Sequence, residues 1–294
     1  MKWIELVTGF TCNCRCVVCP SASMGNASMT AEELDGWLQE GSRQGASGVW
    51  YGGGEPTLHP HLIPSIGKAR SLGYDHIRIQ TNGMRFAYMP FATRCVEAGV
   101  DQVAFSIKGA DPESHDAITR NPGSFAHMTE GIKNLISLGV RVEGEVLVTT
   151  QSMHQLRRTI SEFAERGIGH FTFWLFSTHG LEDPRAAERL PSFSDLRPHL
   201  DAAFEAAASL GVEATSLHTP PCVLSPAFRD RYVHSGTWEL VVVTPGSEPF
   251  MAEESPMEGG VYVDACSRCS LRADCLGFRS DYIEHHGTDG IRPL

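Results

Sequence analysis

The chain has 294 residues, of which 41% are hydrophobic, and its 35 acidic side chains outnumber 24 basic ones, for a formal net charge of −11. This length and apolar content suffice for one large domain with a small extension, or for two domains, and they exclude a chain that is disordered throughout. The acidic balance argues against a nucleic-acid binder, which needs clustered lysine and arginine. Because no apolar run reaches about 18 residues and no secretory signal opens the chain, we expect a cytoplasmic protein with no membrane partner.

Short apolar strands alternate with amphipathic helices from residue 3 to about residue 190. This alternation predicts an α/β fold with parallel strands and right-handed crossovers, either an open doubly wound sheet or a barrel. Six strand and helix units are fewer than a complete barrel needs. The strands are expected at 3–7, 48–51, 76–80, 102–107, 142–149 and 170–176.

Helix signals lie between these strands. Thr30 and Glu33 form a capping box before a helix expected at 31–44, and further helices are expected to begin near Ser124 and Ser152. An alanine-rich helix follows at 193–210. We expect one domain over 1–214 and a small C-terminal module over 215–294, in which strands at 236–243 and 260–266 flank a long mobile loop that is rich in Pro, Gly and acidic residues.

Three cysteines directly after the first expected strand, Cys12, Cys16 and Cys19, have the spacing C-x3-C-x2-C. Three thiolates this close can hold three irons of a cubane cluster and leave the fourth iron open to another ligand, which would make a catalytic site. A zinc knuckle or ordinary buried cysteines are the alternatives. Cys14 lies inside the motif as a decoy ligand or a spare thiol.

A glycine-rich turn, Gly53-Gly54-Glu55-Pro56, follows the second expected strand. Glycines let the backbone approach a ligand, and Glu55 can accept hydrogen bonds from an ammonium group. Together with the cysteine triplet and the alternating pattern, this turn resembles the radical S-adenosylmethionine enzymes over about residues 3–180. The resemblance implies a partial (β/α)6 TIM-like barrel, a 4Fe–4S cluster on the three cysteines, S-adenosylmethionine with its amino group at Gly53–Pro56, and a reductant of the flavodoxin or ferredoxin type.

The resemblance extends to later positions with less specificity. It makes Arg120 a partner for the methionine carboxylate, unless this is a solvated helix arginine. Alternate residues of a strand face one way, so Glu145 and Thr149 are expected to reach the ribose or the substrate. Trp174 is expected beside the adenine, with core packing as the alternative. Further contacts are expected from two residues that end strands, Asn82 and Ser106.

Two positions depart from the pattern of the family. Val18 stands where an aromatic residue is usual, and we expect cofactor binding to survive because the family's contact there is largely through the backbone. Lys108 stands where relatives often carry Asp or His. We therefore infer nothing about the substrate from position 108.

A second group of cysteines lies near the end of the chain, where Cys266, Cys269 and Cys275 have the spacing C-x2-C-x5-C. With Cys222 they offer four thiolates, enough for a second cluster or for a zinc ion. The segment resembles the twitch or SPASM-like modules of radical S-adenosylmethionine enzymes, in the shortened form with one auxiliary 4Fe–4S cluster. Cys222 is the least certain ligand and can instead be a hydrogen-atom donor near the substrate.

The resemblance implies reductive cleavage of S-adenosylmethionine to a 5′-deoxyadenosyl radical that abstracts hydrogen from the substrate, with the auxiliary cluster assisting. We expect a small-molecule substrate in natural-product tailoring, by oxidation, rearrangement, epimerisation or C–C bond formation, because Cys12 follows the start of the chain almost at once, without a leader-binding domain. Modification of a ribosomal peptide is the alternative. An iron–sulfur or zinc protein that only carries electrons or binds a partner explains the cysteines but not Gly53–Pro56.

Overall fold

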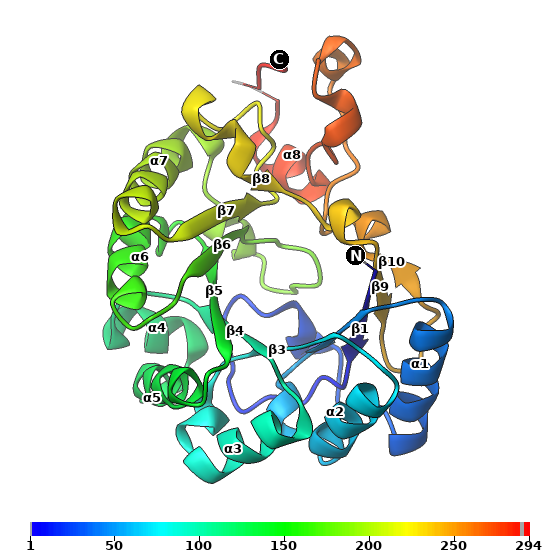
Figure 1. The fold of residues 1–294 in the computed structure, drawn as a ribbon. Helices are drawn as coiled ribbons and strands as arrows, with labels where there is room; N and C mark the ends of the chain where they lie inside the picture. Colours follow the sequence, from blue (N-terminus) through cyan, green and yellow to red (C-terminus); the bar gives the residue numbers. More distant parts are fainter. Residues whose placement is uncertain (1, 289–290) are drawn as a thin grey trace.

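Ten strands form one sheet in the computed structural model, which describes residues 2–288 and 291–294, in the order β10-β9-β1-β2-β3-β4-β5-β6-β7-β8 (Figure 1). Strands β1 to β8 run parallel to their neighbours, β9 runs parallel to β1, and β10 is antiparallel to β9. The sheet curls round a central lumen with helices α1 to α7 outside it. The first six strand and helix units confirm the expected partial (β/α)6 barrel.

Each of the six strands expected in the barrel is present, with ends that differ by at most one residue. The strands are β1 (Trp3–Val7), β2 (Gly48–Gly52), β3 (His76–Thr81), β4 (Gln102–Ile107), β5 (Arg141–Val148), β6 (His170–Leu175), β7 (Glu213–Leu217), β8 (Tyr232–Val233), β9 (Leu240–Val243) and β10 (Phe250–Met251).

The capping box that begins α1 is formed as expected, since the Glu33 N–H donates to Thr30 Oγ1 and the Thr30 N–H donates to Glu33 Oε2. The helices are α1 (Ala31–Arg43), α2 (Leu62–Ser71), α3 (Met89–Ala98), α4 (Pro112–Thr119), α5 (Ser124–Ser137), α6 (Leu156–Ala164), α7 (Phe193–Leu210) and α8 (Ser280–His286). Within the described part of the chain, no helix is long and apolar enough to cross a membrane.

The helix expected to begin near Ser152 begins there as a 3-10 turn. The Ser152 hydroxyl donates to the Leu147 carbonyl and also accepts the Thr149 N–H, so the serine side chain holds the end of β5 in place. A 3-10 turn over Met153–Gln155 follows, and α6 begins only at Leu156. The side chain that reads as a helix start therefore closes a turn.

The expected long loop after residue 243 is wrong in part, because β10 lies within it and pairs with β9. The strand expected at 260–266 does not form. Val261 makes a single bridge to Phe278, and the following N–H groups bond locally, that of Cys266 to the Val263 carbonyl at 2.8 Å. A 3-10 turn over Asp264–Arg268 takes the hydrogen bonds that a strand would need.

Residues beyond 214 take part in the barrel sheet as well as in the C-terminal segment. The domain division expected between residues 214 and 215 falls within β7, which pairs in parallel with β6. Strand β9 lies beside β1, with Trp3 opposite Leu240. The first strand of the chain therefore lies beside a strand that begins at residue 240.

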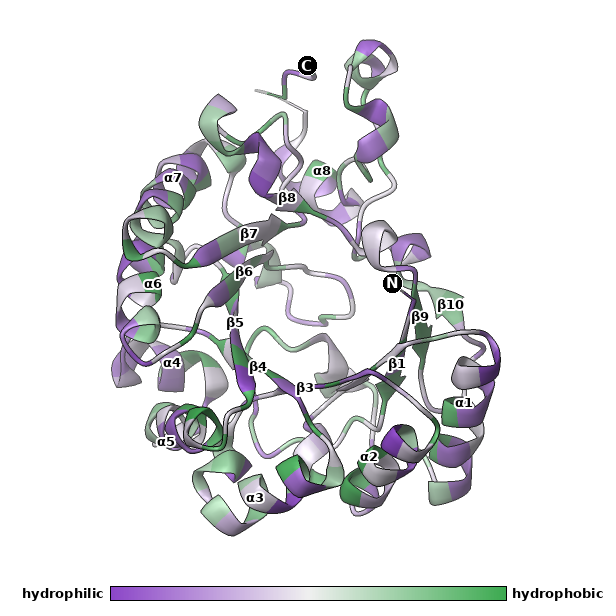
Figure 2. Ribbon diagram, in the orientation of Figure 1, coloured by the Kyte–Doolittle hydropathy of each residue, from purple (hydrophilic) through white to green (hydrophobic). Residues whose placement is uncertain are grey.

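The two faces of the sheet differ in polarity. Outward-facing side chains such as Leu6, Tyr51 and Ile79 are fully buried in one apolar cluster with Leu34 and Ile66 of the helices. The lumen side carries charged and amide groups instead, and purple bands cross β3 and β5 while β9 is green (Figure 2). A closed barrel fills this space with branched apolar side chains. Here the core lies between the sheet and its helices, and the lumen is left polar.

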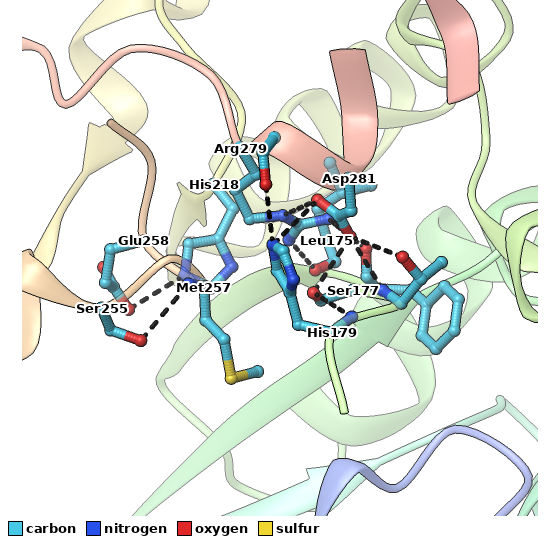
Figure 3. Close-up of polar contacts among 12 residues, drawn as sticks. Leu175, Ser177, His179, His218, Ser255, Met257, Glu258, Arg279 and Asp281 are labelled. Carbon is cyan, nitrogen blue, oxygen red and sulfur yellow. Dashed lines mark hydrogen bonds and ion pairs between the residues drawn. The ribbon is translucent and has the colours of Figure 1, made fainter. Parts of the chain in front are cut away.

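A buried ion pair fastens the C-terminal segment to the end of β6 (Figure 3). The Arg279 side chain is 1% exposed, donates to the Leu175 carbonyl at 2.8 Å and to the Phe176 carbonyl, and pairs with Asp281 at 3.0 Å. Burial opposes the charge on Asp281, but Arg279 and the Thr178 N–H more than compensate and hold its pKa below the usual value. We call this pair the Arg279–Asp281 latch.

Replacing Arg279 by Met should destabilise the protein by about 3 to 5 kcal/mol, because Asp281 then stays buried without its opposite charge and two carbonyls lose their side-chain donor. Urea unfolding followed by circular dichroism measures the change. Arg43→Met is the control, since Arg43 forms an exposed pair with Glu40 on α1 and should show a much smaller loss. Equal losses in the two variants would show that the latch has no structural role.

Candidate functional site

The loop that carries the first cysteine group lies directly after β1 and is held by the end of α4. The Arg15 N–H donates to the Thr119 carbonyl and the Val17 N–H to the Ile118 carbonyl, both at 3.0 Å. The last carbonyls of a helix have no partner within the helix, so the loop satisfies them. Arg120 ends α4 in the left-handed conformation, with φ of 50°. The backbone on both sides of Cys16 is thereby fixed.

The Gly53–Pro56 turn after β2 is bonded to the same loop. The Gly54 N–H donates to the Gly9 carbonyl at 2.8 Å, and the Glu55 N–H donates to the Thr11 carbonyl at 2.9 Å. A Cβ atom at Gly54 would lie 2.5 Å from the Phe10 and Thr11 carbonyl oxygens. Glycine is therefore required here because two backbones touch. We call this contact the backbone seam.

Glu55 is buried and its carboxylate is saturated with donors at the carboxyl ends of β2 and β3. Thr81 Oγ1 donates to it at 2.7 Å and the Asn82 N–H at 2.8 Å, while the Thr57 N–H donates at 3.1 Å. Burial raises the pKa of Glu55 despite these hydrogen bonds. Pro56 starts the 3-10 turn Pro56–Leu58 that supplies Thr57. This carboxylate thus has a fixed orientation, and it joins two strand ends.

The thiols of the first cysteine group interact with one another. Cys14 hydrogen-bonds to both Cys12 and Cys16, which raises its own pKa and lowers theirs. The pKa of Cys16 falls to about 6 because of this hydrogen bond and, against the effect of burial, because of the positive charge of Lys108. Burial raises the pKa of Cys19. Cys12 and Cys16 therefore favour the thiolate form, which binds metal.

Donors surround these sulfurs in the way that an iron–sulfur cluster needs. Asn82 Nδ2 lies 3.8 Å from Cys12 Sγ, and Asn121 Nδ2 lies 3.9 Å from Cys14 Sγ. Lys108 is buried and donates to Ser106 Oγ at 2.7 Å. Hydrogen bonds and charge around ligating sulfurs tune such a site. The residues present fit a cluster, although within residues 2–288 and 291–294 no three potential ligand side chains converge on a single metal ion.

The other residues expected at the site are distributed over four places. Asn82 and Ser106 lie beside the cysteine loop through the contacts above, whereas Glu145 and Trp174 line a cavity in the lumen. Thr149 is fully buried and bonds to Ser152, so it closes the turn after β5. Arg120 is exposed where α4 ends.

Sequence reasoning missed two groups with functional potential. Lys108 was noted only as a departure from the family pattern, although its place after β4 marks it for the site. The second is a buried pair in which His218 Nε2 lies 3.1 Å from Glu258 Oε1 (Figure 3). His218 follows β7 with φ of 66° and stands edge-on to the Trp174 ring at 5.6 Å. Nothing in the spacing of the histidines indicates this pair.

The second cysteine group gathers round one small hollow of about 20 Å³, lined by Cys222, Cys266, Cys269 and Cys275. Burial and the three other sulfurs raise the pKa of Cys222 to about 12. Four sulfurs that line one hollow repel one another as thiolates unless a cation compensates their charge. The hollow fits a metal centre on chemical grounds.

Backbone donors also serve the second group of sulfurs. The Gly277 N–H lies 3.3 Å from Cys275 Sγ, and the Leu294 N–H lies 3.4 Å from Cys269 Sγ. Such contacts stabilise ligating sulfur, as at the first group. The four side chains come from the turn after β7 and from the segment before α8, which the sequence separates by more than forty residues.

Comparison with known proteins decides the family, since residues 6–165 match the Radical SAM superfamily. This chain belongs to the radical SAM superfamily. The resemblance inferred from the motifs is confirmed, as are the expected cofactors of the first site, because a 4Fe–4S cluster and S-adenosylmethionine are what this family uses.

Curated relatives are radical SAM enzymes of several kinds. The chain is 29% identical over 168 residues to the probable GTP 3′,8-cyclase of Methanopyrus kandleri, which covers 56% of this chain and 53% of the relative. It is 30% identical over 152 residues to the mycofactocin maturase MftC of Mycobacterium tuberculosis, covering 50% and 38%. The chain thus spans about half the length of the curated relatives it matches, or less.

Solved radical SAM structures share the fold. SuiB of Streptococcus suis bound to S-adenosylmethionine has a TM-score of 0.70 at 15% identity, over 99% of this chain and 76% of that one. The anSMEcpe structure with bound AdoMet and the Cp18Cys peptide has a TM-score of 0.68 at 15% identity, over 100% and 93%. At this identity the likeness supports the barrel and no more.

Replacing Gly54 by Ala should remove the first cluster of this radical SAM protein, because the new Cβ pushes the cysteine loop off the backbone seam. We expect a loss of about four irons per chain after anaerobic reconstitution, with the helix content unchanged. The control is Gly67→Ala on α2, where a Cβ meets nothing within 4 Å. Full iron content in Gly54→Ala would show that the seam does not position the cysteines.

Proposed function

We propose that this radical SAM protein reductively cleaves S-adenosylmethionine and uses the resulting 5′-deoxyadenosyl radical to take hydrogen from a small molecule. The observation that carries this proposal is the backbone seam, which binds the loop of Cys12, Cys16 and Cys19 to the Gly53–Pro56 turn. Cluster ligands and the turn that faces the cofactor are thereby one rigid unit at the carboxyl ends of the strands, where parallel folds hold their active sites.

The chain's own residues have three tasks in this reaction. Cys12, Cys16 and Cys19 hold the cluster and leave one iron for the cofactor, which supplies the radical when bound. The Gly53–Pro56 turn orients the amino group of the cofactor. Lys108 places a buried positive charge beside the sulfurs, where it favours the thiolate form of Cys16.

A small-molecule substrate is supported by the size of the lumen cavity. Its volume is about 250 Å³, slightly below the range of about 300–1,000 Å³ that small-molecule sites occupy, so it suits a compact small molecule. Natural-product tailoring is the reaction class we propose, in the cytoplasm and with a flavodoxin or ferredoxin-type reductant. The second candidate is modification of a peptide, which is favoured by the likeness to SuiB, solved with its precursor peptide SuiA.

The four cysteines of the C-terminal segment are proposed to hold an auxiliary 4Fe–4S cluster. Support comes from the common hollow they line and from the N–H donors that point at Cys269 and Cys275. The alternative role of Cys222 is that of a hydrogen-atom donor. Because Cys222 lines the same hollow as the other three cysteines, its position supports the role of ligand.

The activity is tested by incubating the reconstituted protein with S-adenosylmethionine and dithionite and measuring 5′-deoxyadenosine. We expect this product from the wild-type protein and none from Cys16→Ala, because the cluster then loses a ligand. Cys95→Ala is the matched control, since Cys95 is buried in α3 within the core. If the wild type makes no product, or if Cys16→Ala makes as much, the chain is not the enzyme we propose and an electron carrier or binding protein is the better account.

The auxiliary cluster is tested by counting metals per chain. The wild type should hold about eight irons and eight sulfides, and Cys269→Ser about four of each. Three cysteines hold the first cluster and leave one iron without a protein ligand, whereas four cysteines hold the second. Cys95→Ala again serves as the control. A count of about four irons and one zinc ion in the wild type would show that the C-terminal cysteines hold zinc and not an auxiliary cluster.

A further inference from the structure

The lumen holds a cavity that extends from the amino-terminal ends of the strands to Trp174, one residue before the carboxyl end of β6. Four of the five tryptophans of the chain line it, Trp3, Trp50, Trp174 and Trp238. Its rim includes His76, Gln102 and His170, each the first residue of its strand. The amino-terminal end of such a barrel usually serves stability alone and is packed. A cavity walled by indole rings at this end therefore calls for an occupant.

The charged groups of this cavity form a network of ion pairs and hydrogen bonds. Arg78 Nη2 lies 2.5 Å from Glu145 and 3.7 Å from Glu143, and the guanidinium stacks on Trp50 with 3.9 Å to the ring centre. Burial opposes the charge of Glu143, but the His170 imidazole, whose Nδ1 lies 3.4 Å from Glu143 Oε1, and the charge of Arg78 outweigh it and lower its pKa to about 2. Arg78 is therefore held in one orientation against an ionised partner.

The carboxylates of this network have their hydrogen bonds within the protein. Glu143 accepts from Gln102 Nε2 at 2.5 Å and from Arg141 Nε at 2.9 Å, and Gln80 Nε2 donates to Glu145 beside Arg78. These acceptors are therefore satisfied without a ligand. A ligand that offers mainly donors, such as an amine, finds few free partners here.

Three donors of the cavity wall, by contrast, have no partner among the described residues. They are Trp50 Nε1, Trp174 Nε1 and Arg78 Nη1, each fully buried. Native proteins rarely leave buried N–H groups unpaired, because the lost hydrogen bonds to water are not replaced. Three such groups round one cavity indicate that an acceptor belongs between them.

We propose that this cavity binds the substrate through a planar ring that carries carboxylate or carbonyl oxygens. The oxygens accept from Arg78 Nη1 and from the Nε1 groups of Trp50 and Trp174, and the ring lies among the indoles, which favour stacking. That the ligand is the substrate rests on the proposed function, whereas the chemical class of the ligand rests on the cavity alone. The charges of Arg78, Arg141, Glu143 and Glu145 sum to zero, so the class includes both neutral carbonyl compounds and monoanions.

Binding is tested with 2-naphthoate and 2-naphthamide as acceptor-bearing probes and with 2-naphthylmethylammonium as the donor-bearing counterpart. Calorimetry and saturation-transfer NMR on the reconstituted protein give the Kd, without S-adenosylmethionine or reductant. We expect at least one acceptor probe to bind with a Kd of about 1 mM or tighter, and the ammonium probe at least tenfold more weakly. Preference for 2-naphthoate identifies a carboxylate, and preference for 2-naphthamide a carbonyl group. Equal binding of all three probes, or no binding, overturns the proposal.

Trp50→Phe is the decisive variant, because it keeps a ring under Arg78 and removes the unpaired N–H group together with part of the indole. We expect the acceptor probe to bind about five- to tenfold more weakly, while the protein still folds, with only the loss of stability that a smaller buried side chain brings. Trp37→Phe, a tryptophan on α1 outside the cavity, should leave the Kd unchanged. An unchanged Kd in Trp50→Phe overturns the assignment of this donor. Since binding is measured without cofactor, a protein that binds the probes but makes no 5′-deoxyadenosine would contradict the proposed function and leave this site standing.

Discussion

The structure depends on an unusual constraint, a parallel barrel whose lumen is not filled with apolar side chains. Burying a charge costs free energy unless the charge is paired. The network of Arg78 with Glu143 and Glu145 therefore takes the place of the apolar packing that such a lumen usually has. The larger apolar cluster accordingly lies between the sheet and its helices, and a smaller one round Trp50, Leu240 and Val242 lies on the other face. Glu5, whose pKa burial raises to about 7, adds a carboxyl that is partly neutral near neutral pH. Stability thus comes from outside the sheet, and the space inside it is available for ligands.

The two ends of the lumen have different chemistry. At the carboxyl ends of the strands, backbone contacts fix the cysteine loop, first to the Gly53–Pro56 turn and then to the last carbonyls of α4. At the amino ends, side chains form the wall and leave donors free. Backbone contacts suit an element that must hold a reactive group in one place, whereas side-chain donors suit recognition, because they can differ among related proteins without a change of fold.

Local patterns in the sequence predicted what depends on local physics. The strands follow from alternation and the helices from their caps, and the cysteine spacing singled out both groups that the structure gathers. Patterns failed where a distant partner decides. Alternation at 260–266 predicts a strand, but only Phe278 is there to pair with it. The convergence of four tryptophans from β1, β2, β6 and the segment before β9 has no local signal, because it arises from the register of strands far apart in the sequence.

The Arg279–Asp281 latch connects the C-terminal cysteine-rich segment with the lumen. Arg279 follows Cys275 by four residues and holds the carbonyls of Leu175 and Phe176, which directly follow Trp174 along the chain. A buried ion pair has one favourable geometry, so a shift of the segment around Cys275 must move the end of β6 or break the pair. The position of Trp174 in the cavity wall is therefore mechanically tied to the C-terminal cysteines.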